Sequence, residues 1–221
     1  MTKQLNVVWL LLFCFFCSCS LDNDDNSETV MIAFATVENP NAAAKYYLLL
    51  DDGTKLYTEE TNDILDPDQG YPKDGRRVFV SYNTIEPESA NKIKLKNMAY
   101  ATIGGISENY DIGRNDRHQL LMLYIGGGDY LNALVAHYLT SASNSKHEVA
   151  LIMKDSEEEG TVYFDLIYSN KGNSGYDYAI SPICFDLSSL KEIYADSVKI
   201  VINTYEESTT SKSYSTVYKW Q

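Results

Sequence analysis

The sequence predicts an all-β protein made of an N-terminal OB-like five-stranded barrel followed by a C-terminal β-sandwich. Its 18 tyrosines and many β-branched residues favour strands over helices. Apolar and polar residues alternate along most of the chain, as in half-buried strands. Turn residues separate these segments, and a polar interval lies near the middle of the chain. We expect the barrel at residues 29–107 and the sandwich at 108–221.

The chain begins with a leader that is typical of a secreted lipoprotein. Lys3 precedes an apolar run, Val7 to Phe16, which spans about 15 Å as a helix, or about half of a bilayer core. The next residues resemble a bacterial lipoprotein box with Cys19 as the lipidated residue, and bulky Phe16 makes Cys17 the poorer candidate. We expect a signal peptide at 1–18 and a lipid anchor at Cys19. An ordinary secreted protein is the alternative.

An acidic tether at residues 19–28 follows the predicted anchor. It has no apolar residue between Leu21 and Val30, so it should be solvated. Asp22, Asp24 and Asp25 resemble the surface-export signal of Bacteroidetes lipoproteins. We therefore expect a monomer anchored by lipid to the outer membrane and exposed at the cell surface, with the periplasmic face as the alternative.

Five segments of the first module read as strands. They are Thr29–Val37, Lys45–Leu50, Thr54–Thr58, Arg76–Ile85 and Asn91–Ile103. Asp51-Asp52-Gly53 predicts a hairpin turn, because glycine accepts the positive φ that such a turn requires. Five short strands with one long connection favour a closed OB-like barrel.

Alternation assigns faces within the last two of these strands. In one, Val78, Val80 and Tyr82 alternate with Arg77, Phe79 and Ser81. In the other, Ile93 and Leu95 lie opposite Lys92, Lys94 and Lys96. Each strand therefore has one apolar face and one face with polar or charged residues.

Gly104-Gly105 and the polar stretch Ser107–Asp116 predict the boundary between the modules. About seven strands follow, with turn signals between them, as in a β-sandwich. They are His118–Ile125, Tyr130–Leu139, Lys146–Lys154, Thr161–Ser169, Gly175–Phe185, Asp196–Tyr205 and Ser213–Trp220. Leu187–Ala195 predicts a helical turn, with Asp186 or Ser188 as its cap.

Charge and cysteine content exclude several classes of function. The formal net charge is −13 and no basic face is evident, so nucleic acid is not an expected partner. Cleavage of the leader leaves Cys19 and Cys184. With Cys19 acylated, Cys184 has no disulfide partner, and its apolar neighbours predict a buried, unreactive thiol.

Other residues that suggest chemistry are better explained structurally. His118, His137 and His147 lack metal-ligand spacing, and Asp63, Asp66 and Asp68 form only part of a calcium loop. Gly126-Gly127-Gly128 follows a strand but precedes no helix, so we expect a turn and not a phosphate loop. Ser81 has no nucleophile elbow around it. We expect no catalytic residue, no metal and no cofactor.

Tyrosines on both modules are candidate stacking platforms for sugars. They are Tyr46, Tyr47, Tyr57, Tyr71 and Tyr82 on the barrel and Tyr163, Tyr168, Tyr176 and Tyr178 on the sandwich. The structural alternative is that tyrosine is simply a good strand residue.

Several short segments give the chain its resemblance to a family. Asp74–Tyr82, Ala136-His137-Tyr138, Lys146–Leu151 and Phe185–Leu190 are similar to segments of the NigD-like lipoproteins of Bacteroidetes. The resemblance implies an N-terminal OB-type domain and a C-terminal β-sandwich. It carries no catalytic residues, since the family's molecular function is essentially unassigned and its name comes from a bacteriocin operon.

We therefore expect a non-catalytic, lipid-anchored envelope protein that binds another envelope protein or an extracellular ligand. Surface glycan binding and protection against a bacteriocin are the alternatives.

Overall fold

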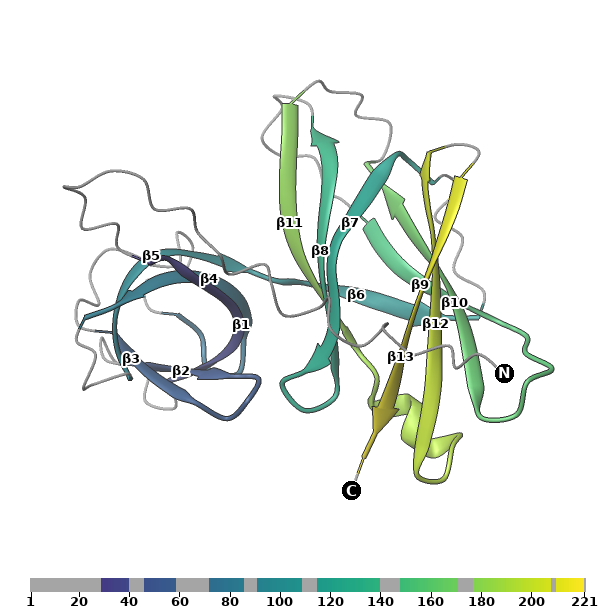
Figure 1. Cartoon of the computed structure of the whole chain (residues 1–221), viewed down its shortest axis with the longest axis horizontal. Coiled ribbons are helices and arrows are strands. Elements are labelled where there is room, and N and C mark those ends of the chain that lie inside the picture. The colour runs from purple at the N-terminus through teal and green to yellow at the C-terminus, as the bar shows by residue number, and fades with distance from the viewer. Residues whose placement is uncertain are drawn as a thin grey trace, which may run out of the picture.

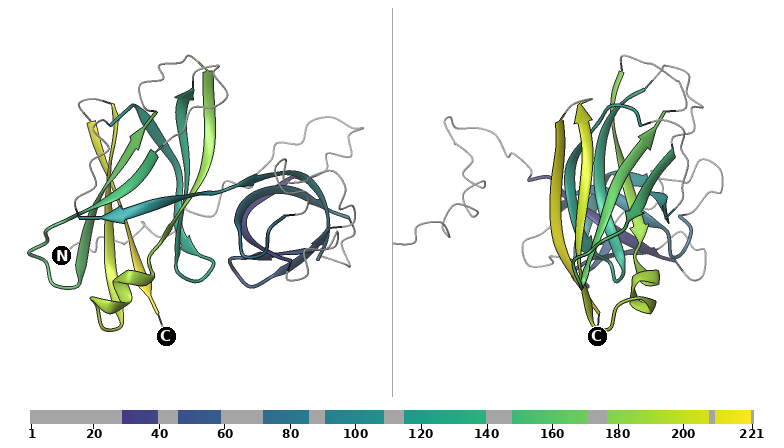
Figure 2. Two further views of the ribbon diagram at one scale, coloured as in Figure 1. Left: turned by 180° about the vertical axis from the view of Figure 1, so that it is seen from behind. Right: turned by 90° about the vertical axis from the view of Figure 1, so that its right-hand side faces the viewer.

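The computed structural model describes residues 29–39, 46–58, 72–85, 91–108, 115–139, 148–170, 177–207 and 210–220. The strands in these ranges form a closed five-stranded barrel and an eight-stranded sheet. The barrel and the sheet lie side by side (Figure 1), and the view from behind in Figure 2 shows the same arrangement. The predicted all-β class, with a barrel followed by a sandwich, is confirmed.

The barrel strands run in the order β1-β2-β3-β5-β4 around the wall. They are β1 (Met31–Glu38), β2 (Tyr47–Leu50), β3 (Lys55–Thr58), β4 (Arg77–Thr84) and β5 (Lys92–Tyr100). β2 and β3 form the predicted hairpin, with Gly53 at φ 86° in its turn. Parallel pairing of Tyr57 with Lys92 and of Thr58 with Ile93 closes the barrel. Buried apolar side chains from all five strands fill its interior.

The second sheet has the strand order β13-β12-β10-β9-β6-β11-β8-β7. Its strands are β6 (Thr102–Ser107), β7 (His118–Gly126), β8 (Tyr130–Leu139), β9 (Glu148–Lys154), β10 (Thr161–Ser169), β11 (Asp177–Asp186), β12 (Ser197–Glu207) and β13 (Thr210–Lys219). The sheet folds back on itself, because β7 at one end contacts β12 and β13 at the other. The two layers enclose a core that includes Leu131, Phe164 and Phe185.

β6 places the division between the domains earlier than the sequence suggested. This strand pairs in parallel with β11 and β9 of the sandwich, although the sequence pattern predicts residues 102–107 in the barrel. The strand pairing therefore divides the chain at Ala101, where β5 continues into β6 (Figures 1 and 2). Gly104 lies inside β6, and glycine is required there because a Cβ would clash with the Phe185 ring. This glycine serves close packing instead of a linker.

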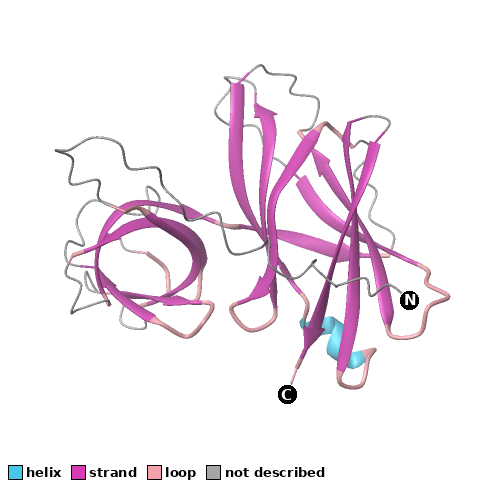
Figure 3. Ribbon diagram, viewed as in Figure 1, coloured by secondary structure: helices cyan, strands magenta, loops and turns pink. Residues whose placement is uncertain are grey.

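A short 3-10 helix, η1 (Ser188–Glu192), connects β11 to β12, as the secondary-structure colouring of Figure 3 shows. The predicted helical turn is present, but the predicted cap at Asp186 or Ser188 is wrong, because Leu187 is the N-cap and no side chain caps the helix. Asp186 instead accepts a local hydrogen bond at Oδ1 from the backbone N–H of Ser188 at 2.9 Å. No helix in the described part of the chain is long and apolar enough to span a membrane.

Candidate functional site

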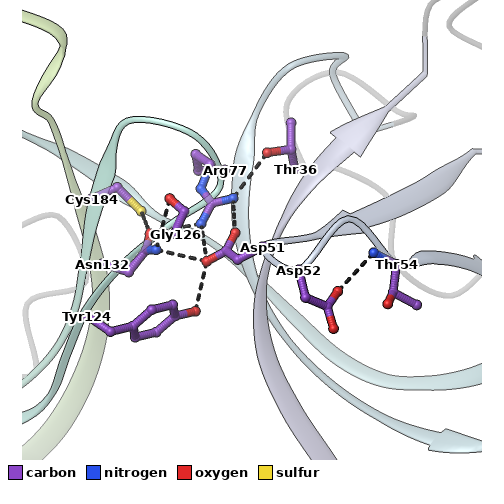
Figure 4. Close-up of polar contacts among 9 residues, drawn as sticks. All are labelled: Thr36, Asp51, Asp52, Thr54, Arg77, Tyr124, Gly126, Asn132 and Cys184. Atoms are coloured by element: carbon purple, nitrogen blue, oxygen red, sulfur yellow. Dashed lines mark hydrogen bonds and ion pairs between the residues drawn. The ribbon is translucent and has the colours of Figure 1, made fainter. Parts of the chain in front are cut away.

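An ion pair between buried Arg77 and half-buried Asp51 lies where the barrel meets the sandwich (Figure 4). The Arg77 guanidinium donates from Nη1 to Oδ1 of Asp51 at 2.7 Å and from Nη2 to Oδ2 at 3.1 Å. Nη1 also donates to the hydroxyl of Thr36 at 3.1 Å. β4 supplies Arg77, and the turn after β2 supplies Asp51. Arg77 and Asp51 thus form a bidentate ion pair on the side of the barrel that meets the sandwich.

Three side chains of the sandwich complete this network. Asn132 on β8 accepts from Nη2 of Arg77 at 2.8 Å and donates to Oδ2 of Asp51 at 2.9 Å. The Tyr124 hydroxyl donates to the same Asp51 oxygen at 2.9 Å. The Cys184 thiol donates to Oδ1 of Asn132 at 3.1 Å. Both charged side chains of the barrel are therefore hydrogen-bonded to the sandwich. We call the following residues the junction network: Thr36, Asp51, Arg77, Tyr124, Asn132 and Cys184.

The turn between β7 and β8 fits closely around the ion pair. Gly127 has φ 64°, and a Cβ there would lie 2.4 Å from Nη1 of Arg77. A Cβ on Gly126 would lie 2.6 Å from Oδ2 of Asp51. The glycine run is thus the predicted turn, and two of its glycines also let the backbone approach both charges.

An apolar cluster lies beside the junction network. Phe34 of the barrel is buried in one cluster with Leu134 and Cys184 of the sandwich. The Phe34 ring lies 5.0 Å from Phe79 and 6.1 Å from Tyr124, between ring centroids. The two domains therefore share a small hydrophobic core as well as a polar network.

Burial and the interaction with Asp51 shift the pKa values of two groups at this site in known directions. Burial opposes the charge on Arg77, but its hydrogen bond and Coulombic attraction to Asp51 prevail and raise its pKa. Burial also raises the pKa of the Cys184 thiol to about 11, so this thiol is protonated at neutral pH and is a poor nucleophile. The predicted burial of Cys184 is confirmed, since its side chain is 0% exposed.

The junction network is suited to holding the domains together. Arg77 is 2% exposed and Asn132 is 0% exposed, so a substrate has little access to either. Sequence reasoning missed this site, although two signals pointed to it. Phe79 shares the charged face of β4 with Arg77, and Asn132 interrupts the apolar run of β8. Both indicate a surface that another domain covers.

A second feature is an exposed apolar face on β7, β8 and β11, which we call the β8–β11 face. It comprises Leu121, Tyr138, Tyr178 and Ile180, which are 38% to 56% exposed. Tyr138 and Tyr178 are cross-strand partners whose ring centroids lie 5.9 Å apart. Tyr138 is six positions beyond Asn132 on β8, which places it about 20 Å from the junction network along the strand.

The predicted tyrosine platforms differ in their exposure to solvent. Tyr46, Tyr82 and Tyr168 are core residues. Tyr57 and Tyr178 are exposed, and Tyr47 is half-buried beside Tyr57. Tyr163 is half-buried and donates to Oε2 of Glu158, whereas Tyr71 and Tyr176 lie outside the described residues. Sequence reasoning missed Tyr138, whose position opposite Tyr178 depends on strand register.

Two of the three histidines come together in the sandwich. His118 and His137 are buried cross-strand partners on β7 and β8, and both rings lie against Tyr168. His118 Nδ1 is 2.9 Å from the Asp116 carbonyl oxygen, and His137 Nε2 is 2.8 Å from the Ser181 hydroxyl. Among the described residues, no group of three or more metal-ligating side chains is placed to hold an ion.

The remaining predicted sites fall mostly on undescribed parts of the chain. His147, the aspartates 63, 66 and 68, the anchor Cys19 and the export residues Asp22, Asp24 and Asp25 all lie outside the described residues. Ser81 is half-buried on β4.

Comparisons with solved structures show relatives of the same fold. A NigD-like immunity protein from Bacteroides caccae superposes with a TM-score of 0.62 at 16% identity, covering 89% of this chain and 99% of that one. A candidate lipoprotein from Bacteroides fragilis has a TM-score of 0.57 at 12% identity, with 87% and 98% covered. A candidate toxin-related protein from Parabacteroides distasonis has a TM-score of 0.60 at 24% identity, with 86% and 94% covered.

Family models agree with the two domains seen in the structure. The NigD-like N-terminal OB domain matches residues 34–98, and the NigD-like C-terminal β-sandwich domain matches residues 101–218. A comparison with curated proteins finds no similar sequence. Because the two models together cover most of the sequence, the chain belongs to the NigD-like family.

Proposed function

We propose that this protein is a lipid-anchored component of the outer membrane that binds a protein partner at the cell surface and catalyses no reaction. The leader and Cys19 support the anchor, as does the fold shared with the candidate lipoprotein of Bacteroides fragilis. The acidic residues after Cys19 support export to the surface.

The β8–β11 face is the observation that carries partner binding. Clustered exposed apolar side chains mark interaction surfaces, and tyrosine is enriched at protein interfaces. Tyr138 and Tyr178 supply large, rigid contact area at low cost in side-chain entropy. The junction network bonds the barrel to the sandwich, so this face keeps one orientation relative to the barrel.

Protection against a bacteriocin is a second candidate function. The superposition with the NigD-like immunity protein from Bacteroides caccae covers 99% of that protein's chain. A protective protein that captures a toxin also needs an exposed protein-binding surface. The β8–β11 face therefore serves either function, and the identity of the partner distinguishes them.

Site-specific photo-crosslinking in intact cells tests the proposal. A photoreactive residue at Tyr178 is expected to give a defined crosslinked protein. The same residue at Val217 on β13, which is 53% exposed, is the matched control and should give none. Equal crosslinking at both positions, or none at Tyr178, would remove the β8–β11 face as a binding surface. Crosslinking to an added bacteriocin from a related strain would assign the protective function.

A further inference from the structure

The outer wall of the barrel carries an aromatic and basic face on β2, β3 and β5. Strand register places Glu38, Tyr47, Tyr57 and Lys92 in one row across four neighbouring strands. The Tyr47 and Tyr57 ring centroids lie 5.8 Å apart, and Tyr57 is 48% exposed. This row therefore presents a pair of adjacent aromatic rings to solvent.

Exposed lysines surround these rings. Lys55 Nζ lies 4.7 Å from the centroid of the Tyr47 ring. Lys92 and Lys94 are exposed and share one face of β5, about 7 Å apart along the strand. The acid of the row, Glu38, accepts a hydrogen bond from the Tyr47 hydroxyl at 3.1 Å. We call Tyr47, Tyr57, Lys55, Lys92 and Lys94 the barrel face.

We propose that the barrel face binds an acidic polysaccharide, whose sugar rings stack on Tyr57 and Tyr47 while its carboxylate or sulfate groups pair with the lysines. Aromatic side chains offer flat, partly polar surfaces on which rings stack, and exposed cations beside them select a ligand of negative charge. Each exposed ion pair contributes little by itself, so binding requires several repeats of the ligand.

The overall charge favours a glycan over nucleic acid. The chain carries a net charge of −13, and Glu59 and Glu60 follow β3 in the sequence. A polymer with one phosphate on every unit meets strong repulsion from such a protein, and a glycan with more widely spaced charges meets less. The barrel face is separate from the β8–β11 face, so the two proposals fail independently.

Binding of defined polymers to the detergent-solubilised full-length lipoprotein tests this inference. The probes are hyaluronan, which carries one carboxylate per disaccharide, neutral dextran and single-stranded oligothymidylate. Hyaluronan is expected to bind with an affinity that falls as salt rises, and dextran is not expected to bind. Tyr57→Ala should weaken binding about tenfold, or about 1.4 kcal/mol, because it removes one of the two rings on which the sugars stack. Lys92→Ala with Lys94→Ala should also weaken binding several-fold and reduce the salt dependence.

Matched controls come from the sandwich. Tyr205→Ala and Lys219→Ala remove an exposed tyrosine and an exposed lysine far from the barrel in sequence, and both should leave the affinity unchanged. Equal binding of dextran, no binding of hyaluronan, or loss of affinity in the control variants would overturn the inference. Preferential binding of oligothymidylate would also overturn it and assign the barrel face to nucleic acid.

Discussion

At the scale of single residues, Arg77 is the side chain on which the domain junction depends. It is 2% exposed, and its guanidinium is bonded to Asp51, Thr36 and Asn132. Its charge also lies 5.2 Å from the centroid of the Tyr130 ring. A buried ion pair of this kind adds little net stability compared with apolar residues, but removal of one partner leaves the other charge unpaired.

Replacement of one member of the ion pair should therefore cost more than replacement of both. Arg77→Met is expected to lower the free energy of unfolding by about 3–5 kcal/mol, because it leaves the Asp51 carboxylate unpaired. The double variant with Asp51→Leu should recover much of this loss. Chemical denaturation of the three proteins measures the effect.

Arg76→Met is the matched control for Arg77→Met. Arg76 is adjacent in sequence but exposed, so its replacement should change stability by at most about 1 kcal/mol. An Arg77→Met variant as stable as Arg76→Met would contradict a central role for the ion pair.

At the scale of elements, the turn from β7 to β8 explains why the glycine run is present. Gly127 and Gly128 both have positive φ, at 64° and 85°. A Cβ on Gly127 would meet Arg77 and Asp51, whereas a Cβ on Gly128 would meet nothing within 4 Å. Substitution at Gly128 therefore tests the backbone conformation alone, whereas substitution at Gly127 tests the conformation together with the contact with the barrel.

Alanine substitution at these two positions should have different effects. Gly128→Ala is expected to cost about 1–2 kcal/mol, from the left-handed conformation alone. Gly127→Ala should cost at least about 1 kcal/mol more, because its Cβ displaces the junction network. It should also speed hydrogen exchange on both sides of the junction, including β1 and β8. If both variants lose the same stability and hydrogen exchange at the junction is unchanged, the turn does not stabilise the contact between the domains.

At the scale of the whole molecule, two β domains share one interface, and the predicted anchor precedes both. The polar junction network and the apolar cluster around Phe34 join the domains. The tether at residues 19–28 would then carry this two-domain body on the membrane. In the proposed function, the tether sets the side of the membrane and the junction sets the angle between the domains.

The anchor and its location are open to direct test. Cys19→Ala should abolish incorporation of labelled palmitate and release the protein from the membrane fraction, whereas Cys17→Ala should retain both. Joint replacement of Asp22, Asp24 and Asp25 by Asn should keep the label but protect the protein from protease added to intact cells. Labelling that persists in the Cys19→Ala variant would refute the anchor, and digestion of the Asn variant would refute the export signal.

Local features of the sequence determined the strands and the order of the domains. Alternation within each strand and the turn at Asp51-Asp52-Gly53 depend on neighbours a few residues apart, so they can be read without the fold. For the same reason, alternation placed Arg77 and Phe79 on one face of β4. It could not show that a second domain covers that face.

Tertiary structure alone decided the division at Ala101, the junction network and both exposed faces. Asp51 and Asn132 are 81 positions apart in the chain, and their contact follows from how the barrel packs on the sandwich. β6 joins the sandwich because its partners are β9 and β11, which come much later in the sequence. Likewise, Tyr138 meets Tyr178, and Tyr57 meets Lys92, only through strand register. Contacts between distant residues depend on the packing of whole elements, which local sequence patterns do not encode.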